Sequence, residues 1–262
     1  MEKLNTVNIL KKLVSFPTVS RDANLDLINY IADIIRCEKV NPTIIKNKEN
    51  TKANLFASIG PENNDGVMLS GHTDVVPIDG QNWTKEPFEC TLEDGLYFGR
   101  GTADMKGFVA SAVNSFIKAK SMKLKRPLYL ALSYDEEIGC LGVRSLIDLM
   151  KELKFKPAMC IVGEPTLMSI ATGHKGKTAL RADCEGVEAH SALAPKGMNA
   201  IHLACDLINE IRSMQNEIAE NGIKDHDYDI PYTTLHVGKI SGGIVLNICL
   251  LYTSPSPRDP WK

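Results

Sequence analysis

One histidine and several carboxylates stand at four points where apolar, strand-like runs of the chain end or are interrupted. The four segments are His72-Thr73-Asp74, Asp104 within residues 99–107, Asp135-Glu136-Glu137, and Glu164 within residues 163–166. Carboxylates gathered in this way repel one another and destabilise a fold unless cations lie between them. An imidazole with several carboxylates is also the ligand set of a two-metal hydrolase. The pattern therefore predicts a metal site.

The spacing within two of these segments suggests a division of labour. His72 and Asp74 are two positions apart, so in an extended segment they point to the same side, where Asp74 can orient the imidazole. Glu136 and Glu137 are neighbours and face opposite ways, so one can bind metal while the other acts as a general base. The structural alternatives are a His–Asp pair that only stabilises a strand end and an acidic turn exposed to water.

Three further residues complete the candidate set. Asp104 lies in a glycine-rich turn before a helix, where its two oxygens could bridge two cations; the alternative is an ordinary N-cap. Glu164 precedes Pro165 at a strand end, and the alternative is a surface carboxylate. His190, in the segment 188–192, could donate a hydrogen bond to an oxyanion, or it could be a loop histidine that only packs.

Apolar spacing predicts the elements that position these residues. Helices are expected at 4–14, 25–38, 106–120 and 143–153, and strands at 43–45, 54–59, 67–70, 96–98, 127–133 and 158–162. This alternation predicts an α/β fold whose sheet has parallel portions, and ligands collect at the carboxyl ends of such strands. After Gly173 the pattern changes to strands at 178–185, 233–240 and 244–248 with a helix at 199–217, which predicts a smaller α+β domain.

Composition narrows the function classes. The chain has 262 residues, 44% hydrophobic, with 30 basic and 32 acidic side chains and a net charge of −2. This balance gives no reason to expect nucleic acid or a membrane surface as a partner. The seven cysteines are scattered and never spaced Cys-x-x-Cys. They favour a cytoplasmic protein with reduced thiols.

Four motifs in this order carry a resemblance to a known family. They are Ser70-Gly-His-Thr-Asp-Val-Val-Pro77, Gly99-Arg-Gly-Thr-Ala-Asp-Met-Lys-Gly107, Tyr134-Asp-Glu-Glu-Ile-Gly139 and Gly163-Glu-Pro-Thr166. The chain resembles the dinuclear zinc amidohydrolases and metallopeptidases that include acetylornithine deacetylase, succinyl-diaminopimelate desuccinylase and the glutamate carboxypeptidases. The resemblance extends to about residue 248. Segments 173–177 and 189–201 lean towards acetylornithine deacetylase.

The resemblance implies a zinc-peptidase-like catalytic domain with a mixed sheet flanked by helices, which we expect in residues 1–173. It also implies an inserted α+β, ferredoxin-like lid or dimerisation domain, expected in residues 174–249. Both domains would be incomplete. Residues 250–262, rich in serine and proline, do not look native to the fold.

The metal ligands implied by the resemblance are shared between two zinc ions, although cobalt or manganese would also suit such ligands. His72, Asp104 and Glu164 would hold one ion, and Asp104 and Glu137 the other. A cis peptide between Asp104 and Met105 is implied as well. Family members carry a last histidine ligand for the second ion further along the chain, whereas here no histidine follows His236.

The remaining implied roles concern catalysis. Asp74 would orient His72, Glu136 would be the general base, and His190 would stabilise the oxyanion, often at a neighbouring subunit's site. Asn247 would contact the substrate. These roles imply a homodimer that acts on a small N-acyl amino acid, most simply N-acetylornithine in arginine biosynthesis. Desuccinylation of succinyl-diaminopimelate, cleavage of another acylamino acid or a dipeptide, and a catalytically inactive fragment stay open as alternatives.

Overall fold

The computed structural model describes residues 4–243. The chain forms two compact units, Met1–Thr172 and Gly173–Lys262, and each is described by itself. The division falls one residue before the domain boundary predicted from the sequence. The functions expected of the two domains stay predictions.

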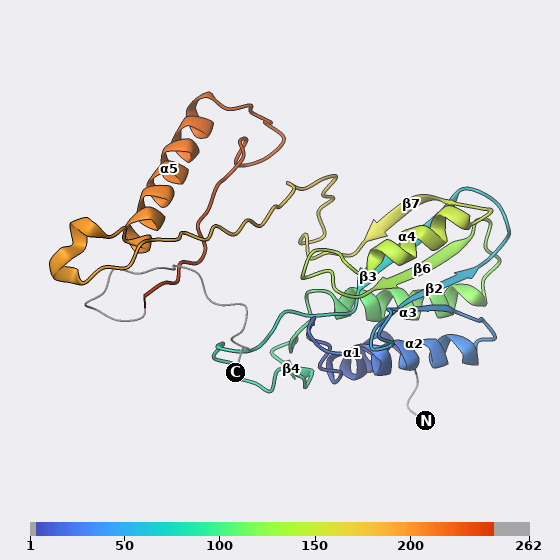
Figure 1. Ribbon diagram of the computed structural model, residues 1–262. Helices are drawn as coiled ribbons and strands as arrows, with labels where there is room; N and C mark the ends of the chain where they lie inside the picture. The colour runs from blue at the N-terminus through green and yellow to red at the C-terminus, as the bar shows by residue number, and fades with distance from the viewer. Residues whose placement is uncertain (1–3, 244–262) are drawn as a thin grey trace. The chain divides into compact units, whose positions relative to one another are not determined.

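The first unit is built on a five-stranded mixed sheet (Figure 1). Its strands in spatial order are β1 (Thr43–Lys46), β2 (Ala53–Ile59), β6 (Leu128–Ser133), β3 (Gly66–His72) and β7 (Pro157–Val162). Strand β2 is antiparallel to both β1 and β6, whereas β3 is parallel to both β6 and β7. The predicted α/β fold with a mixed sheet is confirmed. Strands β6, β3 and β7 therefore end at the same edge, where ligands collect in such sheets.

Helices cover both faces of this sheet. Helices α1 (Thr6–Val14), α2 (Leu25–Cys37) and α3 (Lys106–Lys120) pack in one hydrophobic core with β2 and β6, while α4 (Val143–Glu152) packs on the opposite face (Figure 1). Their bounds confirm the four helices predicted from apolar spacing. Helix α2 illustrates the cause, because its buried side chains recur along one stripe: Leu27, Ile28, Ile31, Ala32 and Ile35.

A short hairpin precedes the turn that carries Asp104. Strand β4 (Thr91–Glu93) pairs antiparallel with β5 (Leu96–Phe98), and only β5 was predicted from the sequence. The connecting Asp94 and Gly95 both have positive φ angles, of 50° and 78°. A two-residue Asp-Gly connection is a strong hairpin signal, and it would have revealed β4.

The second unit contains a 3-10 helix, η1 (Ser191–Lys196), and the long helix α5 (Ala200–Asn221). Helix α5 confirms the helix predicted at 199–217. The strands predicted at 178–185 and 233–240 are wrong for the structure as described, since neither forms a ladder there. A strand exists only through a hydrogen-bonded partner, which apolar alternation alone does not supply. The third predicted strand, Asn247 within it, and the tail 250–262 lie outside the described residues.

Asn24 joins the start of α2 to the sheet and to the segment after His72. Its buried amide donates to the Ala53 carbonyl at 2.9 Å and to Thr73 Oγ1 at 3.0 Å, and it accepts from the Ala53 N–H at 2.8 Å. Asn24→Ala leaves these buried partners unsatisfied, so we expect a loss of about 1–3 kcal/mol in unfolding free energy. Urea unfolding measures it, with Asn29→Ala, on the exposed face of the same helix, as the control. Equal losses in the two variants would contradict this account.

Candidate metal centre

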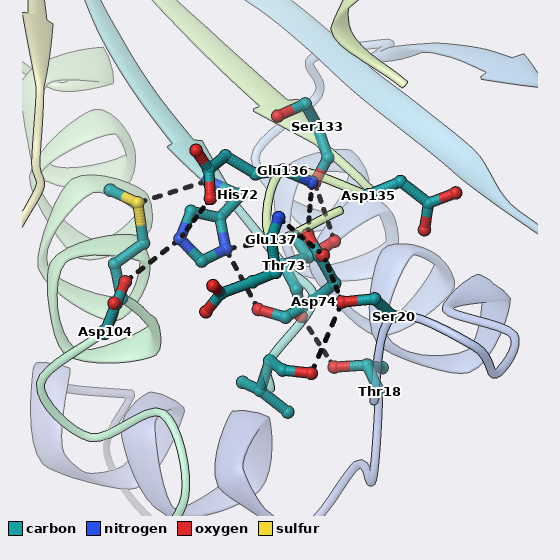
Figure 2. A network of polar contacts seen from close by, with 12 residues as sticks. Thr18, Ser20, His72, Thr73, Asp74, Asp104, Ser133, Asp135, Glu136 and Glu137 are labelled. Carbon is teal, nitrogen blue, oxygen red and sulfur yellow. Dashed lines mark hydrogen bonds and ion pairs between the residues drawn. The ribbon is translucent and has the colours of Figure 1, made fainter. Parts of the chain in front are cut away.

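The parallel edge of the sheet gathers residues that are far apart in the sequence. His72 is the last residue of β3, Glu136 and Glu137 follow β6, and Glu164 lies two residues beyond β7. Asp104 reaches the same place from the turn before α3, as Figure 2 shows beside His72. The peptide bond between Asp104 and Met105 is cis, as the resemblance implies.

His72 Nε2 faces the carboxylates of three different segments. It lies 3.0 Å from Asp104 Oδ1, 3.8 Å from Glu164 Oε1 and 3.9 Å from Glu136 Oε2. The His72 side chain is only 1% exposed, whereas Asp104, Glu136 and Glu164 are 38–48% exposed. A buried imidazole nitrogen therefore points out at a ring of solvent-accessible oxygens. His72 Nε2 is the atom that all three of these carboxylates approach.

The other ring nitrogen fixes the tautomer of His72. Nδ1 lies 2.9 Å from the backbone oxygen of Asp74. A carbonyl oxygen can only accept a hydrogen bond, so Nδ1 must carry the proton. In the neutral ring the lone pair is then on Nε2, directed at the carboxylates, which is the arrangement a metal-ligating histidine needs.

The carboxylate of Asp74 forms hydrogen bonds with residues from two other segments. It accepts hydrogen bonds from Ser20 Oγ at 2.7 Å and from the backbone N–H groups of Glu136 and Glu137 at 3.1 and 3.3 Å (Figure 2). Its distance to His72 Nδ1 is longer, at 3.6 Å. Burial opposes ionisation of Asp74, but the nearby His72 ring and hydrogen bonds from Ser20 and the Glu136 N–H outweigh it and lower the pKa of this carboxyl. Asp74 therefore touches His72 mainly through its backbone oxygen, while its carboxylate fixes the turn that carries both glutamates.

The negative charges of the carboxylates at this edge repel one another. Burial and the neighbouring charge of Asp104 raise the pKa of Glu137, despite the opposing effect of His72. Burial and the same neighbour also raise the pKa of Glu164. A cation between these carboxylates would stabilise their ionised forms and offset their mutual repulsion.

Two overlapping groups have donor atoms close enough to hold an ion. One consists of His72, Asp104 and Glu137, and the other of His72, Glu136 and Glu164; within each group the atoms lie within 4.8 Å of one another. Imidazole nitrogen with carboxylate oxygens suits Zn²⁺, and also Co²⁺ or Mn²⁺. The residues present therefore fit a metal of the expected kind. A cavity of about 180 Å³ lies beside them, lined by residues that include Asp104 and Glu137.

Two other predicted residues are not part of the described first unit. His190 belongs to the second unit, where its Nδ1 accepts the Ala192 N–H at 3.1 Å. Asn247 lies outside the described residues. Ser20 and Lys52 were missed by sequence reasoning, since each touches the site through a partner more than 50 positions away.

A buried lysine was part of a quoted motif but had no predicted role. Lys106 is fully buried, and its Nζ donates to the Phe16 carbonyl at 2.7 Å. Burial lowers the pKa of Lys106 to about 7, although the charge of Asp74 acts against this. Lys106 thereby connects the Asp104 turn to the segment after α1.

A carboxylate-rich cluster around one histidine, at the parallel edge of a mixed sheet, defines an α/β protein with a candidate metal centre. The chain belongs to Peptidase family M20/M25/M40, whose family model matches residues 68–238. This family is metal-dependent. In the described part of the chain, no helix is long and apolar enough to cross a membrane.

Individual relatives agree with this membership. Acetylornithine deacetylase of Shigella sonnei is 34% identical over 252 residues, which are 93% of this chain and 64% of that protein. The chain thus spans less than two thirds of that relative. Among solved structures, an M20 family metallo-carboxypeptidase from Sulfolobus solfataricus has a TM-score of 0.66 over 95% of this chain and 69% of its own, at 17% identity. A tripeptidase from Staphylococcus aureus has a TM-score of 0.59 over 95% and 63%, also at 17% identity. These two structures support the fold.

Loss of the extra proton of His72 should make the metal-free chain less stable at alkaline pH. Burial opposes protonation of the ring, but Asp74 and Glu164 outweigh it and raise the pKa of His72 to about 9 from an ordinary value of 6.5. A raised pKa gives stability that is complete below pH 6.5 and is lost as the pH rises through 9. Its size is on the order of 3 kcal/mol.

The measurement is urea unfolding with a chelator at pH 6 and pH 9, for the unmodified chain and for His72→Gln. We expect the stability advantage of the unmodified chain to shrink at pH 9. The lowered pKa of Lys106 changes stability with pH in the opposite direction. Because both proteins contain Lys106, its effect cancels when their stabilities are compared at each pH. Parallel pH profiles for the two proteins would show that His72 is not charged in the metal-free fold.

Proposed function

We propose that the chain is the metal-binding part of a hydrolase that cleaves the amide bond of an N-acyl amino acid, with N-acetylornithine as the favoured substrate. The observation that carries this proposal is that His72 Nε2 faces carboxylates from three other segments, at 3.0, 3.8 and 3.9 Å. Acetylornithine deacetylase of Shigella sonnei, 34% identical, supports the choice of substrate. The product ornithine would belong to arginine biosynthesis.

The metals of the proposed site are two zinc ions. His72, Asp104 and Glu164 would hold one, and Asp104 and Glu137 would hold the other, with Asp104 between them. This partition rests on the family resemblance, since the two compact donor groups divide the carboxylates differently. Bound zinc would polarise the substrate carbonyl and lower the pKa of water.

Glu136 is the proposed general base. It takes a proton from the attacking water and delivers it to the leaving amine, which keeps the proton count balanced. Its backbone N–H is held by Asp74 at 3.1 Å, so its position is fixed relative to His72. Glu137 leaves the same turn as its neighbour, and its role is that of a ligand.

His190 is the proposed donor to the oxyanion. Because its Nδ1 accepts the Ala192 N–H, the neutral ring carries its proton on Nε2. The ring thus offers a hydrogen-bond donor without having to be charged. The substrate contact of Asn247, a homodimer and a cytoplasmic location complete the proposal, and they rest on the resemblance.

Zinc binding tests the metal part of this proposal on the chain itself. At most one zinc per chain should stay firmly bound after dialysis, and His72→Gln should lose it. Substrate choice is tested in a fusion of residues 1–248, which keep Asn247, with the part of the Shigella relative that follows the matching region. Acetylornithine should be cleaved in preference to succinyl-diaminopimelate and to dipeptides. If the fusion preferred succinyl-diaminopimelate or a dipeptide, the assignment of acetylornithine as substrate would be wrong. A zinc-loaded fusion that cleaved none of the three substrates would indicate a catalytically inactive protein.

Changing each of the two glutamates to glutamine should have different effects on zinc content and turnover. Glu136→Gln should keep the zinc content and lower turnover in the fusion by about 10²–10⁴-fold, the usual effect of losing one general base. Glu137→Gln should lose zinc as well as turnover. Metal analysis and acetylornithine hydrolysis on the same samples measure both effects. Loss of zinc in Glu136→Gln alone would exchange the two roles.

A further inference from the structure

A buried ion pair lies directly behind the two glutamates, outside both candidate ligand groups. Lys52, the residue before β2, places its Nζ 2.6 Å from Asp135 Oδ1. The two side chains are only 13% and 12% exposed. Most surface ion pairs contribute little, but burial removes competing water and makes the geometry of such a pair matter.

Asp135 determines the direction in which the chain leaves β6. Its φ angle is +56°, in the left-handed region that residues other than glycine seldom adopt. Its backbone oxygen accepts the Leu141 N–H at 3.0 Å, which closes the turn around Glu136 and Glu137. A conformation of this kind persists where surrounding contacts hold it. Lys52 supplies such a contact to the Asp135 side chain.

Lys52 also reaches the opposite side of the same turn. Its Nζ donates to the backbone oxygen of Ser20, and Ser20 Oγ donates to the Asp74 carboxylate. Asp74 in turn accepts the N–H groups of Glu136 and Glu137. The contacts therefore form a closed circuit that runs from Lys52 through Asp135 and the glutamate turn to Asp74 and Ser20, and back to Lys52.

We propose that Lys52 is a positioning residue, which sets the direction of Glu136 and Glu137 towards the metal centre by holding Asp135 and Ser20 at once. This inference rests on the proposed function for its consequence, since the direction of the glutamates matters for metal binding and proton transfer. Lys52 itself touches neither the candidate ligand atoms nor the cavity beside them.

The main test measures zinc affinity of the 262-residue chain by competition with a chromophoric chelator. Lys52→Met should weaken zinc binding by about 10-fold to 100-fold, as is typical when a residue that orients a ligand is removed. Lys52→Arg keeps a cation in place and should recover most of the affinity. The matched control is Lys46→Met, which removes the same charge from an exposed position in the neighbouring strand β1. Unchanged affinity in Lys52→Met would overturn the proposal.

A double variant separates positioning from simple stabilisation. Lys52→Met leaves the Asp135 charge buried without its partner, so the single variant will also be less stable. Lys52→Met with Asp135→Asn removes both charges and should regain stability in urea unfolding, while the zinc affinity stays low. Recovery of affinity together with stability would show that the pair only supports the fold, and would overturn the positioning role.

A metal-free measurement keeps this inference distinct from the proposed function. In the presence of chelator, hydrogen exchange at the amides of Glu136 and Glu137 should be slow in the unmodified chain and clearly faster in Lys52→Met. Lys46→Met should leave these amides unchanged. If the unmodified chain bound no zinc, the proposed function would fail while this exchange difference would still support the positioning of the turn. Equal exchange rates at these amides in Lys52→Met and Lys46→Met would overturn the positioning role of Lys52.

Discussion

The contacts of Asp74 are the constraint on which the rest of the site depends. Its backbone oxygen fixes the proton of His72 on Nδ1, and its buried carboxylate holds Ser20 and the N–H groups of Glu136 and Glu137. One residue thereby ties the end of β3 to the turn after β6 and to the segment between α1 and α2. Both the imidazole lone pair and the two glutamates take their directions from it.

The fold gathers several carboxylates at one partly buried edge of the sheet, where they repel one another. Three parallel strands end at one edge, and acidic residues follow each of them. Burial, together with the neighbouring charge of Asp104, raises the pKa of Glu137 and Glu164 there. Lys52 and Lys106 are tied to backbone carbonyls behind the cluster, so neither lysine neutralises its open side. The open side therefore keeps a negative potential, which favours the binding of cations.

The sequence predicted the first unit well because local patterns decided it. Apolar spacing located the four helices, and buried strands such as β6 are short apolar runs that end in charged residues. Strand ends grouped His72 with the segments of Glu136, Glu137 and Glu164, and Asp104 was added from its glycine-rich turn. Ser20 and Lys52 could not be found in that way, since their contacts depend on the tertiary fold. The strands expected at 178–185 and 233–240 failed for a related reason, because a strand requires a partner that local alternation does not specify.

The geometry also limits how many ions the described residues can hold at full strength. Both compact donor groups use His72, yet its Nδ1 is occupied by the Asp74 carbonyl, which leaves one lone pair on Nε2. A single nitrogen can serve one ion at a time. Two ions side by side therefore require a bridging carboxylate, for which Asp104 with its two oxygens lies in the right place, 3.0 Å from Nε2. Within the described part of the first unit, residues 4–172, the ion on the Glu137 side then has only carboxylates, and a nitrogen ligand for it would have to come from outside that unit.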